Sequence, residues 1–268
     1  MKVSTGSLSG VVPIIPTPFT EAEEIDEQAL CNLIDFAVDG GIETVCLPAY
    51  ASEFYKLTDE EKLYVVKVAV DHAAGRIKIV AQSNNPSLRG AIKLARENVK
   101  AGADVVSLAV PRIFSLPEDS LKEYLGEFLQ SIPDTPVLIQ DFNPGGASIS
   151  VNFIEALMNE HPNFKYLKLE EPLCAPKFEE IIKRTKGNIG LFEGWGGLYM
   201  LELIPLGIAG APTATVPMLR LDQAGGLEVI AARWGLIPFW WKSAKPPKNT
   251  FNARSEEAAT KPMWRSAY

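Results

Sequence analysis

The sequence predicts a (β/α)8 barrel, in which eight parallel strands alternate with helices and close into a ring. Short β-rich apolar segments alternate with amphipathic stretches up to about residue 216. Strict alternation of this kind implies a parallel sheet with helical crossovers. The strand candidates number eight, the count of a closed barrel. They cover residues 11–15, 44–47, 77–81, 105–110, 136–140, 166–169, 189–192 and 207–215.

Amphipathic stretches between these strands predict the crossover helices. One of them starts at Thr58-Asp59-Glu60-Glu61, a capping-box pattern. The predicted helices cover residues 28–38, 63–73, 88–100, 119–129, 151–159, 176–186 and 198–206. An open, doubly wound sheet is the competing architecture. It is disfavoured because Pro16-Thr17-Pro18-Phe19, and no G-x-G-x-x-G, follows the first strand.

The pattern changes after the eighth strand. Residues 218–221 and 227–231 flank a glycine-rich turn and predict a β-hairpin. No amphipathic helix of ordinary length follows, so we expect a barrel without its usual closing C-terminal helices and with exposed apolar surface on its first and eighth strands. Residues 212–268 contain eight basic and four acidic residues, a net charge of +4. Because the whole chain carries −7, residues 1–211 carry −11. We therefore expect a barrel over residues 1–211 and a short β-rich segment of different origin over 212–268.

Composition excludes several classes of protein. With 47% hydrophobic and 22% charged residues, the chain is an ordinary globular protein. It has no apolar run of membrane-spanning length and no secretory leader in residues 1–10, so we expect a cytoplasmic protein without a membrane partner. Three separated cysteines form no C-x-x-C pair, and the two histidines lack neighbouring ligands. We therefore expect no disulfide, metal or cofactor.

Lys168 is the residue whose chemistry most needs an explanation. It lies in Tyr166-Leu167-Lys168-Leu169-Glu170, where alternate side chains point to opposite faces of a strand. One interpretation is a lysine that reaches water or pairs with Glu170 or Glu171. The other is a desolvated amine that attacks a carbonyl carbon and forms a Schiff base. The strand alone is compatible with both.

Barrel enzymes carry their active-site residues at the C-terminal ends of the strands and on the loops that follow. At those positions stand Thr17-Pro18-Phe19, the run Leu57-Thr58-Asp59-Glu60-Glu61 after Glu53, Asn143-Pro144-Gly145 and Lys168. In this order they resemble the dihydrodipicolinate synthase / N-acetylneuraminate lyase superfamily of class I aldolases. The resemblance implies that Lys168 is the Schiff-base lysine and condenses with the keto group of pyruvate or a related 2-oxo acid. The protonated imine would then be the electron sink for making or breaking a bond to carbon.

Several of that family's helper residues are replaced here. With Pro144 aligned on the family's proline, Asp141 stands where the proton-relay tyrosine is expected. We expect Asp141 to act as an acid or base, the alternative being a cap of the following loop. The synthase's arginine for the aldehyde carboxylate is replaced by Gly146. We therefore expect an aldolase, lyase or dehydratase on a different 2-oxo acid, rather than the synthase itself.

The substrate-binding loop of the family also differs in this chain. It reads Ala49-Tyr50-Ala51-Ser52-Glu53, which leaves Ser52 and backbone N–H groups as donors for the substrate carboxylate. The partner implied is a small-molecule 2-oxo acid, and the oligomeric state stays open. The expected substrate-binding residues are Thr17, Tyr50, Ala51, Ser52 and Gly194.

The C-terminal segment carries a second resemblance. Arg233-Trp234-Gly235-Leu236-Ile237-Pro238 and Asn252-Ala253-Arg254-Ser255-Glu256 are similar to the SOS-response-associated peptidase (SRAP) family, which crosslinks to abasic sites in single-stranded DNA. The resemblance implies that Asn252 and Arg254 are a remnant of a lesion-binding site. The family's reactive cysteine at position 2 is Lys2 here, so we expect no lesion chemistry. Nucleic acid would bind through this tail alone; the alternatives are a partly unfolded basic tail and a fusion without either activity.

Overall fold

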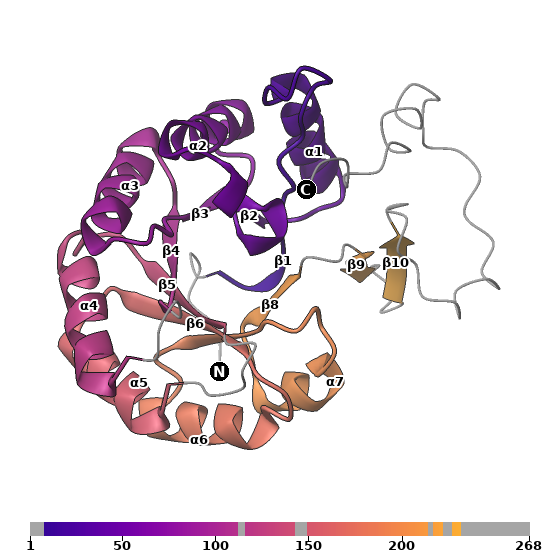
Figure 1. Cartoon of the computed structure of the whole chain (residues 1–268). Helices are drawn as coiled ribbons and strands as arrows, with labels where there is room; N and C mark the ends of the chain where they lie inside the picture. Colours follow the sequence, from indigo (N-terminus) through magenta and orange to yellow (C-terminus); the bar gives the residue numbers. More distant parts are fainter. Residues whose placement is uncertain (1–7, 112–115, 143–148, 214–216, 222–226, 232–268) are drawn as a thin grey trace, which may run out of the picture. The chain divides into compact units, whose positions relative to one another are not determined.

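The computed structural model describes residues 8–111, 116–142, 149–213, 217–221 and 227–231. The chain divides into two compact units, Met1–Thr215 and Val216–Tyr268. In the first unit, strands and helices alternate around a ring (Figure 1). This arrangement confirms the predicted (β/α)8 barrel.

Eight parallel strands form the wall of the barrel. They are β1 (Gly10–Pro13), β2 (Thr44–Leu47), β3 (Lys78–Gln82), β4 (Val105–Ala109), β5 (Val137–Phe142), β6 (Phe164–Glu170), β7 (Gly190–Glu193) and β8 (Gly210–Thr213). The pairing order is β1-β8-β7-β6-β5-β4-β3-β2. The ring is completed next to β1, where Ile14 bridges Cys46 and the Ile15 N–H donates to the Cys46 carbonyl at 3.0 Å.

Helices cover the outside of this wall. They are α1 (Glu27–Asp39), α2 (Asp59–Ala73), α3 (Leu88–Ala101), α4 (Glu118–Gln130), α5 (Val151–Glu160), α6 (Ala175–Thr185) and α7 (Met200–Leu203). The predicted capping box begins α2: the Thr58 hydroxyl accepts from the Glu61 N–H, and the Glu61 carboxylate accepts from the Thr58 N–H. One continuous helix over 198–206 was expected. The structure has the short α7 and a 3₁₀ turn, η3 (Ile204–Leu206), because Pro205 cannot donate the N–H that an α-helix needs.

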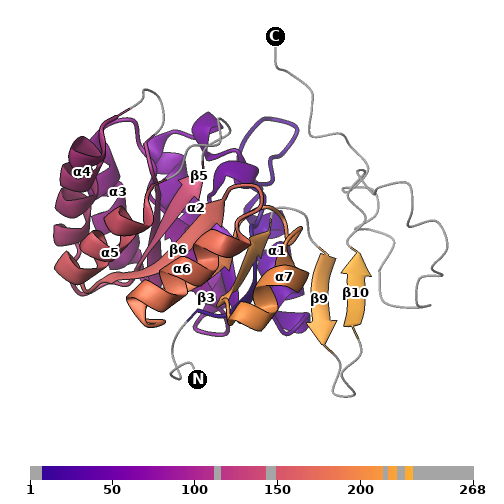
Figure 2. The ribbon, with the colours of Figure 1, turned by 90° about the horizontal axis from the view of Figure 1, so that it is seen from below.

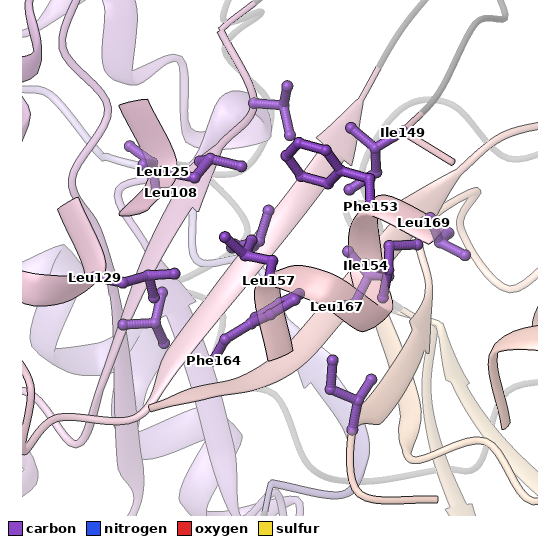
Figure 3. Packing of buried hydrophobic residues seen from close by; sticks show 14 of the residues in the cluster. Leu108, Leu125, Leu129, Ile149, Phe153, Ile154, Leu157, Phe164, Leu167 and Leu169 are labelled. Atoms are coloured by element: carbon purple, nitrogen blue, oxygen red, sulfur yellow. The ribbon is translucent and has the colours of Figure 1, made fainter. Parts of the chain in front are cut away.

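Apolar side chains pack in two layers, one on each face of the barrel wall. The outer layer packs strand residues such as Leu167 and Leu169 against helix residues such as Leu157 (Figure 3). The inner layer fills the barrel with Val80, Leu138, Tyr166 and Phe192, among others. Because neighbouring residues of a strand point to opposite faces, membership of one layer shows which way each side chain of a strand points.

The closing strands differ from expectation in their exposure. Val12 of β1 and Ala211 of β8 are buried, so the expected exposed apolar surface is not found on these described residues. Large exposed apolar side chains lie instead beside and within α7, where Leu198, Leu201 and Ile204 are exposed. Because the described part of the first unit ends with β8, the expected absence of a closing helix stays a prediction.

The second unit contains the predicted hairpin. Strands β9 (Pro217–Leu221) and β10 (Leu227–Ala231) are antiparallel, with Leu221 opposite Leu227 and Pro217 opposite Ala231 (Figure 2). Asn252 and Arg254 lie outside the described residues, so nucleic-acid binding through the tail stays a prediction.

Candidate active site

Lys168 points into the barrel. Its Cα is in register with Gln140 of β5 and Phe192 of β7, and Phe192 belongs to the inner apolar layer. Only 6% of the residue is exposed. A buried amine is expensive unless it is paired, so its partner decides what it does.

That partner is Glu170, two residues further along β6 and therefore on the same face. Lys168 Nζ and Glu170 Oε1 are 2.8 Å apart. The same Oε1 accepts a short hydrogen bond from Gln140 Nε2, and Gln140 Oε1 accepts from Gln82 Nε2 at 2.7 Å. A polar chain therefore crosses the barrel from β3 to β6 and ends at the lysine.

Gly194 forms the wall behind this ion pair. A Cβ added at Gly194 would lie 2.2 Å from Glu170 Cγ and 3.0 Å from Lys168 Cε. Its N–H donates to the Leu169 carbonyl at 2.8 Å, which holds the backbone against β6. The structure thus brings the predicted residues Gly194 and Lys168 together.

Tyr50 is the second predicted residue near the ion pair. It lies in η1 (Tyr50–Ser52), and its ring centroid is 5.2 Å from that of Phe142, the residue in register with Glu170. Burial raises the pKa of the Tyr50 hydroxyl, and the negative charge of Glu170 raises the pKa further. The hydroxyl therefore stays protonated at neutral pH and can donate a hydrogen bond.

Thr17 and Ser52 organise the loops at the same end of the barrel. Ser52 Oγ donates to the Ile15 carbonyl at 2.5 Å and accepts from the Ala49 N–H at 3.0 Å. Thr17 Oγ1 donates to the Ser52 carbonyl at 3.3 Å. Ala51 packs against the inner apolar layer. In this structure the two hydroxyl groups donate to backbone carbonyls, so they join the loops after β1 and β2.

Asp141 does not share a face with Lys168. Its Cα is in register with Leu169, which packs in the outer layer, whereas Lys168 is in register with Gln140. Asp141 is buried, and its Oδ2 accepts from the Ile149 N–H at 2.9 Å. This bond matches the alternative interpretation, a cap of the loop after β5. The expected acid/base role beside the lysine does not match this orientation.

Sequence reasoning did not single out Glu193, which is fully buried at the end of β7. Its two oxygens accept from the Trp195 N–H at 2.9 Å and the Gly197 N–H at 2.7 Å. Burial raises the pKa of this carboxyl group. Glu193 is in register with Leu169 and therefore points to the outer face of the barrel wall. Its two hydrogen bonds anchor the loop after β7, much as the bond of Asp141 anchors the loop after β5.

Gln82 and Gln140 were likewise not assigned to the site, whereas Glu170 was named from the sequence as one possible partner of Lys168. The available signal was an amide at the C-terminal end of two predicted strands: Gln140 is the last residue of the fifth, and Gln82 directly follows the third. Cys46 also faces the barrel; burial raises the pKa of its thiol to about 11, and the charge of Lys168 opposes this rise. The thiol therefore stays protonated. Among the described residues, no group of three or more His, Cys, Asp or Glu could hold a metal ion.

These features define a (β/α)8 barrel with a buried, carboxylate-paired lysine in a polar interior. The dihydrodipicolinate synthetase family model matches residues 7–225, and the chain belongs to this family. The SOS response associated peptidase (SRAP) model matches residues 207–268. The two matches overlap across β8 and β9.

Known relatives agree with the family assignment. The chain is 27% identical to an L-2-keto-3-deoxyarabonate dehydratase of Azospirillum brasilense, over 86% of this chain and 78% of the relative. It is 31% identical to a 4-hydroxy-tetrahydrodipicolinate synthase of Aquifex aeolicus, over 75% and 67%. The crystal structure of dihydrodipicolinate synthase from Aquifex aeolicus superposes with a TM-score of 0.73 at 29% identity, covering 79% of this chain and 72% of that one. In the described residues, no helix is long and apolar enough to cross a membrane.

Proposed function

We propose that this protein is a class I lyase that forms a Schiff base between Lys168 and the keto carbon of pyruvate or a related 2-oxo acid. The observation that carries the proposal is the ion pair between Lys168 and Glu170, 2.8 Å long and buried inside the barrel. The alternative interpretation, a lysine that only reaches water or pairs with Glu170 or Glu171, includes this same contact. We disfavour it because a buried ion pair contributes little net stability, so pairing alone gives no reason to desolvate two charges inside the barrel.

Glu170 is the group that can move the protons. Imine formation requires the ammonium to lose a proton, and Glu170 Oε1 lies within hydrogen-bonding distance of Nζ. The neutral amine adds to the keto carbon, and the carbinolamine releases water to give the protonated imine. Removal of a C3 proton then places the electron pair in an enamine. The enamine can take up an electrophile, or it can expel a hydroxyl from the next carbon as water.

The remaining predicted contacts differ in their support. Tyr50 and Gly194 border Glu170, so we assign them to the substrate. Thr17, Ala51 and Ser52 stay predictions, since the hydroxyl groups of Thr17 and Ser52 donate within their own loops. We assign proton transfer to Glu170 rather than Asp141, because Asp141 points to the opposite face of the sheet.

We further propose a dehydratase or lyase reaction on a hydroxylated 2-oxo acid, in place of the synthase reaction. The similarity to a keto-deoxy sugar acid dehydratase over 86% of this chain supports this choice. The replacement of the synthase's carboxylate-binding arginine by Gly146 supports it as well.

Borohydride trapping tests the Schiff base directly. Incubation with pyruvate and sodium borohydride should add one reduced pyruvyl group, and peptide mapping should place it on Lys168. Lys168→Met should remove the adduct. Lys62→Met is the matched control, because Lys62 is also a buried lysine with a carboxylate partner, Asp59, at 2.9 Å, but on the helix α2. Absence of an adduct with every 2-oxo acid tried would contradict the proposal.

We also propose that two pieces of different origin meet within or just after β8. The family matches overlap over residues 207–225, and the compact units divide at Val216, close to the expected boundary between 211 and 212. Deleting residues 217–268 tests whether the barrel keeps its cooperative unfolding and its borohydride adduct without the second piece.

A further inference from the structure

The two glutamines inside the barrel have a fixed direction. An ionised carboxylate only accepts hydrogen bonds, so Gln140 must turn its Nε2 toward Glu170. Gln140 Oε1 then faces β3, and because it is an acceptor, only a hydrogen-bond donor can pair with it there. Gln82 supplies that donor, with Nε2 at 2.7 Å. The charge on Glu170 therefore orients both amides.

This direction leaves an acceptor unsatisfied. Gln82 Oε1 is buried and has no hydrogen-bond partner among the described residues. A buried polar atom without a partner costs about 1–3 kcal/mol. A pair that served only to fill the barrel could be replaced by apolar side chains without this cost. The arrangement therefore points to a role for the two amides at Glu170.

The contacts of Glu170 Oε1 indicate what this role is. Glu170 Oε1 receives both Lys168 Nζ and Gln140 Nε2, so the carboxylate is tied from β6 and from β5. No such bond to Oε2 occurs within the described residues, and Oε2 is the oxygen left to exchange protons with a bound substrate. When the lysine becomes a protonated imine, Nζ keeps only one N–H, which is fixed in direction by the planar imine. Gln140 then remains as the second donor that keeps Glu170 in place.

We propose that Gln140, supported by Gln82, is a positioning residue that holds the Glu170 carboxylate for proton transfer at the carbon next to the imine. This inference rests on the proposed function at Lys168. It concerns a step after imine formation, so the two can fail separately.

Pyruvate alone can serve as the probe, because its methyl protons exchange with solvent deuterium only when the enamine forms and is reprotonated. Exchange is followed by proton NMR in D2O, and imine formation by the borohydride adduct. Gln140→Leu should slow exchange at least about tenfold, since small misplacements of a catalytic group are costly. The trapped adduct at saturating pyruvate should stay within about twofold of the wild type. Gln82→Leu should show a smaller loss in the same direction.

Non-additivity separates positioning from a loss of packing. In a Glu170→Gln background, Gln140→Leu should add little further loss, because the group it positions is already gone. Asn98→Leu is the matched control, because Asn98 is a buried amide on α3 that donates to Ser83 Oγ at 3.0 Å. Its loss should lower the stability of the protein and leave the ratio of the deuterium-exchange rate to the yield of trapped adduct unchanged. Thermal unfolding confirms that each variant is folded.

Three outcomes would overturn the proposal. One is an unchanged exchange rate in Gln140→Leu. Another is a Gln140→Leu substitution that slows exchange as much in the Glu170→Gln background as it does in the wild type. The third is a wild-type protein that traps pyruvate but does not exchange its protons. Failure of the wild type to trap any pyruvate or other 2-oxo acid would instead remove the proposed function itself.

Discussion

Lys168 and Glu170 occupy alternate positions of one strand and form an ion pair inside the barrel, with 2.8 Å between Nζ and Oε1. Their side chains are 7% and 12% exposed. Desolvation of both charges offsets most of the attraction between them, so such a pair contributes little net stability. Removing one partner, however, leaves the other as an uncompensated charge.

This imbalance gives a first prediction. Lys168→Met should lower the free energy of unfolding by about 3 kcal/mol, because Glu170 is left buried without its cation. Adding Glu170→Gln to the same chain should recover most of the loss. Chemical denaturation measures both values. A double variant no more stable than Lys168→Met would contradict the idea that the unpaired carboxylate causes the loss.

Gly194→Ala should disturb the ion pair without touching either charge. The new Cβ would stand 2.2 Å from Glu170 Cγ, so the carboxylate must move away from the lysine. We expect a loss of about 1–3 kcal/mol in stability, as for other overpacked sites, and slower adduct formation with pyruvate. Leu198→Ala, an exposed position in the following loop, should change neither quantity. Normal trapping rates in Gly194→Ala would show that the close approach is not needed.

Glu193 predicts a pH dependence of stability. Its pKa in the folded protein is raised above the ordinary 4.5 by burial, so the folded state binds this proton more tightly than the unfolded chain does. The resulting stabilisation is fully present below the unfolded pKa and is lost as pH rises through the folded pKa. Glu193→Gln has no proton to lose at this position. The stability of the wild type relative to this variant should therefore fall as pH rises above the ordinary value of 4.5.

Urea denaturation at several pH values measures this difference between the two proteins. Any constant effect of exchanging one acceptor oxygen for an amide cancels when only the slope with pH is compared. A difference that stays flat, or that grows in favour of the wild type with rising pH, would contradict the assigned direction of the pKa shift.

The closure of the barrel predicts a strong effect at Gly210. A Cβ there would lie 1.9 Å from the Gly10 carbonyl oxygen, so β1 and β8 could not keep their pairing. Gly210→Ala should cost about 3 kcal/mol or more. Gly10→Ala is the matched control, because it meets open space and only its φ of 77° opposes a side chain, at about 1–2 kcal/mol. Equal losses in the two variants would argue against a steric seam.

The sequence by itself determined the barrel, because strand and helix periodicities are local and each βα unit repeats them. It also determined which lysine to consider and predicted the hairpin that β9 and β10 form. The single helix expected over 198–206 failed at Pro205, where a local rule that sequence reasoning could have applied ends the α-helix.

Only the tertiary structure decided which polar groups meet Lys168. The register of β5 on β6 turns Gln140 inward and Asp141 outward, and a shift of one residue would reverse the two. Glu170 was known from the sequence as a neighbour, but its bonds to Gln140 and the packing of Gly194 against it join three separate strands and loops. Side-chain alternation is a property of one strand, whereas the set of groups that share the inside of a barrel depends on how all its strands are paired.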